Sequence, residues 1–217
     1  MVLWDWNGTL LDDAAASLCA VNAMLERRGL PRLDLARYRD CFGFPVRGFY
    51  AAAGFRLEAE DWDALAREFH DAYSRQEAHL FPDAATCLAA GFRAGLRQSV
   101  LSVSEQSRID AQVAAEGVAG AFERVAGVRD LNGVSKRDAG RALMRALRVP
   151  PGETLLIGDT LHDAEIADDL GVSCALVARG HQSETRLRRS GHPVFSSLAE
   201  IFLPKSFQSG RMSDRES

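Results

Sequence analysis

Three aspartates in two short motifs are the residues best suited to chemistry in this sequence. Asp5 follows the apolar segment 1–4, and Asp159 and Asp163 follow the apolar run 155–158, which ends in glycine. A four-residue spacing places Asp159 and Asp163 on one face of an opening helical turn. Either residue could instead serve only to cap that helix or to complement its dipole.

The three carboxylates need a counter-charge if the strands that carry them are neighbours. Like charges about 4 Å apart repel by about 1 kcal/mol in water and by about 4 kcal/mol at an effective dielectric constant of 20. Mg²⁺ takes carboxylate oxygens, waters and substrate phosphate as ligands. The pattern therefore predicts a magnesium site at Asp5, Asp159 and Asp163 that handles a phosphate group.

Lysine is rare in this chain. Arginine supplies 24 of the 26 basic residues, and lysine occurs only at Lys136 and Lys205. One lysine cannot neutralise three carboxylates, but a compact ammonium fits a crowded carboxylate and phosphate site better than a guanidinium does. Lys136 is therefore a candidate for such a site, with chance as the alternative.

The elements expected around these residues fall into two groups. Between residues 13 and 79, apolar residues follow helical spacing and no strand is expected, whereas strands and helices alternate after residue 80. The expected helices span 13–29, 33–42, 46–53, 58–79, 84–94, 108–116, 135–147 and 160–170, and the expected strands span 1–4, 98–102, 154–157 and 173–177, with a short apolar segment at 122–125.

This alternation predicts an α/β fold with a doubly wound parallel sheet and a helical insert. Ligands of such sheets bind beyond the carboxyl ends of the strands. The polar residues at those ends are Asp5, Asn7, Ser102 and Asp159, and Lys136 begins a helix in the same half of the chain.

Four motifs in this order resemble those of the haloacid dehalogenase-like hydrolase superfamily. They are Asp-Trp-Asn-Gly-Thr-Leu at 5–10, Ser102 at a strand end, Lys136, and Gly-Asp-x-x-x-Asp at 158–163. The resemblance covers roughly residues 1–203 and is nearest to the phosphoglycolate phosphatase-like branch, which has an inserted helical cap. It implies a Rossmann-like hydrolase core at 1–13 and 81–203, a helical cap at 14–80, and a flexible tail at 204–217.

The resemblance also implies roles for the motif residues. Asp5 would be the nucleophile that forms an aspartyl-phosphate, and it would also bind Mg²⁺. The other metal ligands would be the backbone carbonyl of Asn7, the Asp159 carboxylate, and Asp163 directly or through water. Lys136 would neutralise phosphate charge and steady Asp5.

Further residues are expected to bind the substrate. Ser102, which ends an apolar run, would hydrogen-bond the phosphoryl oxygens, and Ser104 is the alternative. Thr9 of the first motif is assigned to the same task. Arg47, in the turn at 43–47 of the helical insert, could hold an anionic group of the substrate, or could simply be solvent-exposed.

Asn7 departs from the superfamily pattern, which places an aspartate there as general acid and base. A carboxamide cannot exchange a proton at physiological pH. This loss typically costs roughly 10²–10⁴-fold in rate, or about 3–5 kcal/mol. Two hypotheses follow: a Mg²⁺-dependent phosphohydrolase of a small phosphorylated metabolite, slowed or restricted to leaving groups that need no proton, or a phosphometabolite-binding or regulatory protein with little turnover.

The histidines are not expected to replace the missing acid. Helical geometry turns His162 away from the face that carries the motif aspartates, and His70 and His79 belong to the insert, where packing or surface roles are expected. His181 and His192 fall in polar turns and are expected to be solvated.

Composition limits the other classes of function. A formal net charge of −4 gives no electrostatic reason to expect nucleic acid or an anionic membrane as a partner. The four scattered cysteines, without a Cys-x-x-Cys pair, suit a reducing compartment. With no apolar run of about 20 residues and no signal-peptide pattern, we expect a cytoplasmic protein. The sequence does not indicate an oligomeric state.

Overall fold

A computed structural model describes residues 1–128 and 136–203 of the 217-residue chain. Its centre is a six-stranded parallel sheet with the order β5-β4-β1-β6-β7-β8. The strands are β1 (Val2–Trp4), β4 (Gln98–Glu105), β5 (Arg124–Val128), β6 (Leu155–Gly158), β7 (Ser173–Val177) and β8 (Val194–Phe195). The predicted doubly wound α/β fold is confirmed.

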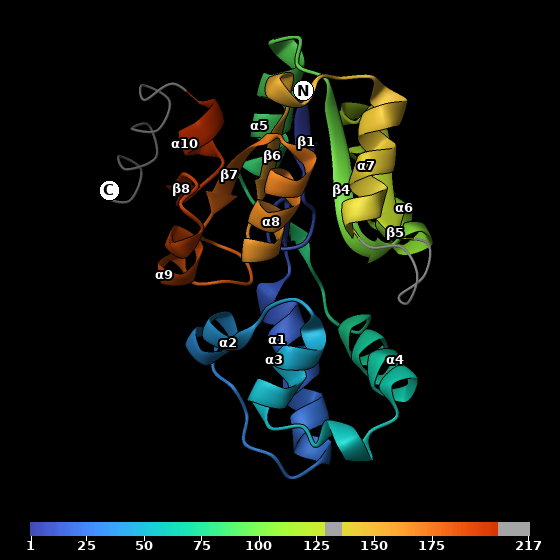
Figure 1. The fold of residues 1–217 in the computed structure, drawn as a ribbon. Coiled ribbons are helices and arrows are strands. Elements are labelled where there is room, and N and C mark those ends of the chain that lie inside the picture. Colours follow the sequence, from blue (N-terminus) through green and yellow to red (C-terminus); the bar gives the residue numbers. More distant parts are fainter. Residues whose placement is uncertain (129–135, 204–217) are drawn as a thin grey trace, which may run out of the picture.

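Helices cover both faces of this sheet (Figure 1). Alternate residues of a strand point to opposite faces, so Val2 and Trp4 of β1 belong to one hydrophobic cluster and Leu3 belongs to the other. The first cluster includes residues of α5 (Ala84–Arg93) and α6 (Gln106–Ala115), with α10 (Ala199–Phe202) packed against it, and the second includes residues of α7 (Lys136–Leu147), α8 (Leu161–Leu170) and α9 (Glu184–Leu187).

The strand order reverses direction at β1. The chain runs from β1 through β4 to β5 on one side, and then from β6 through β7 to β8 on the other. The carboxyl ends of β4, β1 and β6 therefore border the crevice where ligands of such sheets bind.

A helical region, residues 14–73, lies beyond this edge of the sheet (Figure 1). It comprises α1 (Ala14–Arg27), α2 (Leu35–Cys41), α3 (Val46–Ala53) and α4 (Trp62–Tyr73), with a short 3-10 turn at Leu57–Ala59. These elements share a hydrophobic cluster of their own that includes Met24, Tyr38 and Phe49. The division of the chain into a hydrolase core and a cap at the predicted boundaries stays a prediction.

The chain enters and leaves the helical region through a two-stranded ribbon. β2 (Leu11–Asp12) pairs antiparallel with β3 (His79–Leu80). The expectation of helix through residue 79 without a strand is therefore wrong, because α4 ends at Tyr73 and residues 79 and 80 form a strand. His79 pairs with Asp12 and Leu80 pairs with Leu11, which lie 67 and 69 residues earlier in the chain. Local periodicity does not contain such a long-range pairing.

Some of the predicted element bounds agree with the structure, and others fall outside the described residues. Helix Val46–Ala53 and strand Ser173–Val177 match their predicted bounds. The flexible tail at 204–217 and the predicted first residue of the helix at 135 lie outside the described residues. In the described parts of the chain, none of the helices has the length and apolarity needed to cross a bilayer.

Candidate active site

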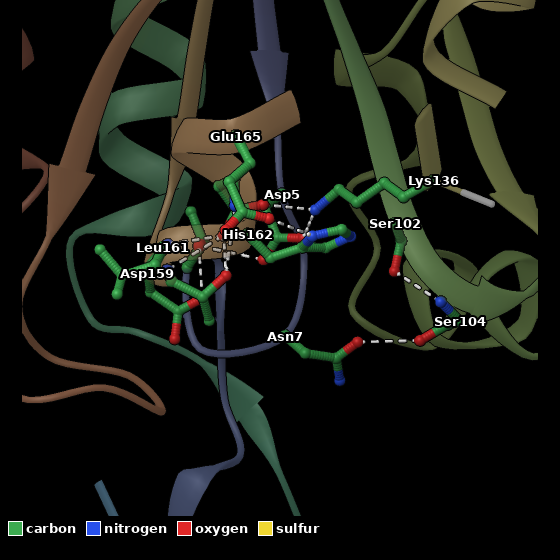
Figure 2. A network of polar contacts seen from close by, with 12 residues as sticks. Asp5, Asn7, Ser102, Ser104, Lys136, Asp159, Leu161, His162 and Glu165 are labelled. Carbon is green, nitrogen blue, oxygen red and sulfur yellow. Dashed lines mark hydrogen bonds and ion pairs between the residues drawn. The ribbon is translucent and has the colours of Figure 1, made fainter. Parts of the chain in front are cut away.

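The predicted carboxylates meet at the crevice. Asp5 follows β1, Asp159 follows the neighbouring strand β6, and Asp163 lies in the first turn of α8. All three are buried, and one carboxylate oxygen from each lies within 4.8 Å of the others. In Figure 2, the side chain of Lys136 points toward Asp5.

Lys136, the first residue of α7, is the counter-ion of this group. Its Nζ donates to Asp5 Oδ1 and, at 2.5 Å, to Asp163 Oδ1, while only 2% of its side chain is exposed. Although burial opposes the charged form, Asp163 and Asp5 raise the pKa of the Lys136 ammonium above its ordinary value. The one lysine in the described residues is thus fixed between two of the motif aspartates.

The charges around Lys136 do not balance. Burial, reinforced by Asp163, raises the pKa of Asp5 to about 6, and burial also raises the pKa of Asp159 to about 8. Asp163 differs, because Lys136 lowers its pKa despite burial. The ionised form of the cluster is therefore costly without a further cation, and its all-oxygen donor set is the kind that Mg²⁺ binds.

Asp163 has a structural task in addition to its charge. Its Oδ2 accepts hydrogen bonds from the Thr160 hydroxyl at 2.6 Å and from the Thr160 backbone N–H at 3.0 Å, in a capping box at the start of α8. Thr160, and not Asp159, is the N-cap residue. A Cβ at Gly158 would lie 2.3 Å from Asp163 Cγ, so the glycine that ends β6 makes room for this carboxylate.

Asp159 is held by backbone. The N–H of His181 donates to Asp159 Oδ2 at 2.6 Å. Gly8 has a φ of +73°, and a Cβ there would lie 2.2 Å from the same oxygen, so only glycine allows this approach. Asp159 Oδ1 faces Thr9, whose hydroxyl is 3.4 Å away.

Both polar atoms of the Asn7 side-chain amide form hydrogen bonds. Its Nδ2 donates to Asp13 Oδ2 at 2.8 Å, and its Oδ1 accepts from the Ser104 hydroxyl at 2.9 Å (Figure 2). An aspartate at position 7 would therefore lie in hydrogen-bonding range of the carboxylate of Asp13. The amide at position 7 and the carboxylate at position 13 form a matched pair.

Asp13 is a site residue that the sequence analysis missed. It is buried and accepts three further hydrogen bonds, from the Gly8 N–H (2.8 Å), the Tyr73 hydroxyl (2.8 Å) and His181 Nε2 (3.2 Å). Against the effect of burial, His181 lowers the pKa of Asp13. A second aspartate soon after the first motif was the available signal.

The expectation that His181 is solvated is wrong. Its side chain is buried, with Nε2 on Asp13 and Nδ1 2.9 Å from the Tyr38 hydroxyl. Asp13 outweighs burial and raises the pKa of His181 to about 9. The residues after β7 cross the same edge of the sheet as the other motifs, and the rule for carboxyl ends of strands could have identified this histidine.

The other residues expected to bind the substrate differ in how deeply they are buried. The hydroxyl of buried Thr9 donates to Asp5 Oδ2 at 3.1 Å. Ser102 is fully buried and its Oγ accepts from the Ser104 backbone N–H at 3.0 Å, whereas Ser104 lines the cavity described next. Arg47 also lines that cavity, with its guanidinium 5.1 Å from the centre of the Trp62 ring.

A cavity of about 720 Å³ joins the carboxylates to the helical region. Asp5, Asp159 and Lys136 lie on its sheet side. Its other side, which we call the aromatic wall, is formed by Phe42, Phe44, Phe49, Tyr50, Trp62 and Phe69. His162 also lines the cavity and lies 4.9 Å from the Phe44 ring, so the expectation that it turns away is wrong.

Comparison with known proteins agrees with this arrangement. The sequence profile of haloacid dehalogenase-like hydrolases matches residues 2–177. The chain belongs to this family. A predicted phosphatase from Clostridium acetobutylicum has the same fold, with a TM-score of 0.78 over 93% of this chain and 95% of that one at 20% identity.

Two relatives that match most of this chain are phosphatases. The chain is 33% identical over 186 residues to N-acetylmuramic acid 6-phosphate phosphatase from Pseudomonas aeruginosa, covering 83% of this chain and 82% of the relative. It is 31% identical over 193 residues to phosphoglycolate phosphatase from Caulobacter vibrioides, covering 84% and 81%. The prediction of a phosphatase-type member of this family is confirmed at the level of these relatives.

Proposed function

We propose that this chain is a Mg²⁺-dependent phosphohydrolase that acts on a small phosphorylated metabolite through an aspartyl-phosphate at Asp5. The observation that carries the proposal is the convergence of three buried carboxylates at the crevice of the sheet, two of which are paired with one lysine. Phosphoryl transfer depends mainly on positioning and charge stabilisation, and this arrangement supplies both.

The donor set supports a magnesium ion. Asp5, Asp159 and the backbone carbonyl of Asn7 would be its protein ligands. Asp163, whose two oxygens accept hydrogen bonds from Lys136 and Thr160, would bind the ion directly or through water. When bound, Mg²⁺ would offset the negative charge that the carboxylates and the phosphate bring together.

Chain groups then have separate tasks in the reaction. An Asp5 oxygen attacks phosphorus, the bond to the leaving oxygen breaks, and water later attacks the aspartyl-phosphate to release phosphate and restore Asp5. The Lys136 ammonium stabilises charge on the phosphoryl oxygens. The Ser102 or Ser104 hydroxyl binds one of these oxygens, and the cavity-lining position of Ser104 favours Ser104.

The helical region would act as the cap, excluding water and recognising the rest of the substrate. A cavity of about 720 Å³ suits a small metabolite and lies in the usual range for ligand sites, about 300–1,000 Å³. The relatives' substrates, N-acetylmuramic acid 6-phosphate and phosphoglycolate, are small phosphate esters. We place the enzyme in the reducing cytoplasm, in keeping with its four free cysteines.

Phosphate release from a panel of phosphorylated metabolites, with Mg²⁺ or with EDTA, tests the proposal. We expect activity that needs Mg²⁺ and disappears in Asp5→Asn. Asp12→Asn is the matched control, because Asp12 is exposed and does not line the cavity. Activity that survives Asp5→Asn would contradict the proposal.

A second candidate function is phosphometabolite binding without efficient turnover, which the Asn7 amide favours. It predicts micromolar binding of a phosphorylated ligand with less than one turnover per hour. Calorimetric titration beside a single-turnover assay separates the two functions, because an enzyme converts the ligand that it binds.

A further inference from the structure

The site combines an aromatic cavity wall with the absence of a proton donor at position 7. We infer that its substrates are phosphate esters with an aromatic leaving group, in which an aryl oxygen is bonded directly to phosphorus. This inference rests on the proposed function and specifies its substrate class.

The first step concerns the leaving oxygen. An alkoxide is about as basic as hydroxide, so an alkyl phosphate needs an acid beside this oxygen. A phenol has a pKa of about 10, so its oxygen can depart as the anion. The amide of Asn7, held by Asp13 and Ser104, supplies no such acid.

Among the residues that the structure describes, Asp13, His181 and His162 lie near the site, and their contacts do not suit them to replace it. Asp13 accepts four hydrogen bonds, and its proton partner His181 has both ring nitrogens occupied, by Asp13 and Tyr38. His162 lies against the Phe44 ring, with its Nδ1 3.4 Å from Glu165 Oε2.

The second step concerns the body of the leaving group. The aromatic wall faces the carboxylates across one cavity, and its rings pack at angles that suit edge and face contacts, as between Phe42 and Phe44 (5.6 Å, 81°) and between Phe42 and Phe49 (5.3 Å, 63°). A planar ring in the substrate would gain such contacts in addition to the burial of its apolar surface. The wall therefore favours an aryl group over an aliphatic chain.

The chemistry balances without an added acid. An Asp5 oxygen forms a bond to phosphorus while the bond from phosphorus to the aryl oxygen breaks, and its electron pair leaves on the phenolate, which takes a proton from solvent. Water then attacks phosphorus, Asp5 departs as a carboxylate, and both protons of the water stay on the phosphate as dihydrogen phosphate. Because no general base aids the attack of water, the second step is expected to limit turnover.

Four esters distinguish the effect of an aromatic ring from the effect of the basicity of the leaving group. They are phenyl phosphate, benzyl phosphate, acetyl phosphate and ethyl phosphate. Phenyl and acetyl phosphate have leaving groups of low basicity, whereas phenyl and benzyl phosphate carry a ring. We expect kcat/KM for phenyl phosphate to exceed that for benzyl phosphate by at least about 10²-fold. We also expect a burst of 4-nitrophenolate from 4-nitrophenyl phosphate of about one equivalent per active site.

Outcomes distinguish this inference from the proposed function. If none of the four esters releases phosphate in Mg²⁺ while a metabolite of the panel does, the inference is overturned and the proposed function stands. If neither the esters nor the metabolites release phosphate, the proposed function fails as well. If benzyl and ethyl phosphate react as fast as phenyl phosphate, the proposed function stands and the inference is overturned. If alkyl ester activity is high and falls in His162→Gln, His162 is the acid and the inference is likewise overturned.

A double variant tests the role of position 7. Asn7→Asp alone would place two carboxylates together, so we combine it with Asp13→Asn, which exchanges the amide and the carboxylate, and use Asp13→Asn alone as the control. The exchange is expected to lower the ratio of phenyl to ethyl phosphate activity at least about tenfold. An unchanged ratio in a folded double variant would overturn the inference.

The aromatic wall is tested through KM. Phe44→Leu is expected to raise KM for phenyl phosphate about fivefold and to leave KM for acetyl phosphate unchanged. Phe92→Leu is the control, because Phe92 is 69% exposed on α5 and does not line the cavity. Equal changes in KM for the two esters would overturn the assignment of the ring to this wall.

Discussion

The two sides of the cavity solve different physical problems. The sheet side gathers buried charge from loops and helix starts that follow strands, and its carboxylates have raised pKa values at Asp5 and Asp159. The helical side gathers rings from a separate hydrophobic cluster, and its strongest ionic contacts lie away from the cavity, between Arg28 and Glu60 and Glu68. The two sides thus differ in what they bury, because the sheet side holds ionisable groups and the helical side holds apolar and aromatic ones.

Loss of Asp5 should have the largest effect, because it removes the proposed nucleophile and leaves the aromatic wall intact. We expect Asp5→Asn to lower kcat at least about 10⁴-fold while a non-hydrolysable aryl phosphonate still binds. Steady-state kinetics and calorimetry measure the two quantities. If Asp5→Asn kept a kcat within tenfold of that of the native chain, Asp5 would not be the nucleophile, and the sheet side would not be the side that carries out the reaction.

Loss of Lys136 should be the largest single cost to stability on the sheet side. Lys136→Met leaves Asp5 and Asp163 buried without their counter-ion, and breaking a buried pair in this way typically costs about 3–5 kcal/mol. Urea denaturation in EDTA measures the free energy of unfolding.

The control for Lys136 is Arg137→Met. Arg137 pairs with Asp169 on the surface, with 45% of its side chain exposed, so we expect a change within about 0.5 kcal/mol. If Lys136→Met lowered the free energy of unfolding no more than Arg137→Met does, the charges on the sheet side would have to be solvated.

The metal-free protein should lose stability as pH rises from about 6.5 to 8. The folded pKa values of Asp159 (about 8) and His181 (about 9) lie above their unfolded values, so the native state holds more protons and the free energy of unfolding decreases with pH. Between about pH 4 and 6.5, Asp5 acts in the same direction, but His70, whose pKa burial lowers to about 4, acts in the opposite one.

Asp159→Asn checks this window, because it removes the group whose pKa rises most among the three carboxylates. In EDTA at pH 8 we expect the variant to be more stable than the native chain by at least about 1 kcal/mol, and we expect Mg²⁺ to stabilise only the native chain. Thermal and urea unfolding across pH provide the measurement. Parallel pH profiles for the two proteins would contradict the assignment.

Charged pairs on the helical side, away from the cavity, are expected to affect stability without affecting kcat. Arg28→Met removes charged hydrogen bonds to Glu60 and Glu68, with 22% of the Arg28 side chain exposed, and should cost about 1–3 kcal/mol. Arg32→Met, at a pair that is more than half exposed, should cost less than about 0.5 kcal/mol. Neither should change kcat, and a fall in kcat at Arg28 would show that the two sides are energetically coupled.

Much of the architecture could be predicted from the sequence because it depends on local patterns. The alternation of strands and helices after residue 80 gave the parallel sheet, and the ends of apolar runs located Asp5 and Asp159. Lys136 could be selected because lysine is so rare in the chain. Each of these signals lies within a few consecutive residues or in the composition.

What only the tertiary structure decided depends on partners far apart in the sequence. His181 is buried because residues 168 and 143 positions away, Asp13 and Tyr38, hold its ring. The orientation of Asn7 is set by Asp13 and by Ser104, 97 positions away. Hydropathy reports whether a residue can be buried, but a polar residue is buried only where folding brings it a hydrogen-bonding partner, and that partner is absent from its local sequence.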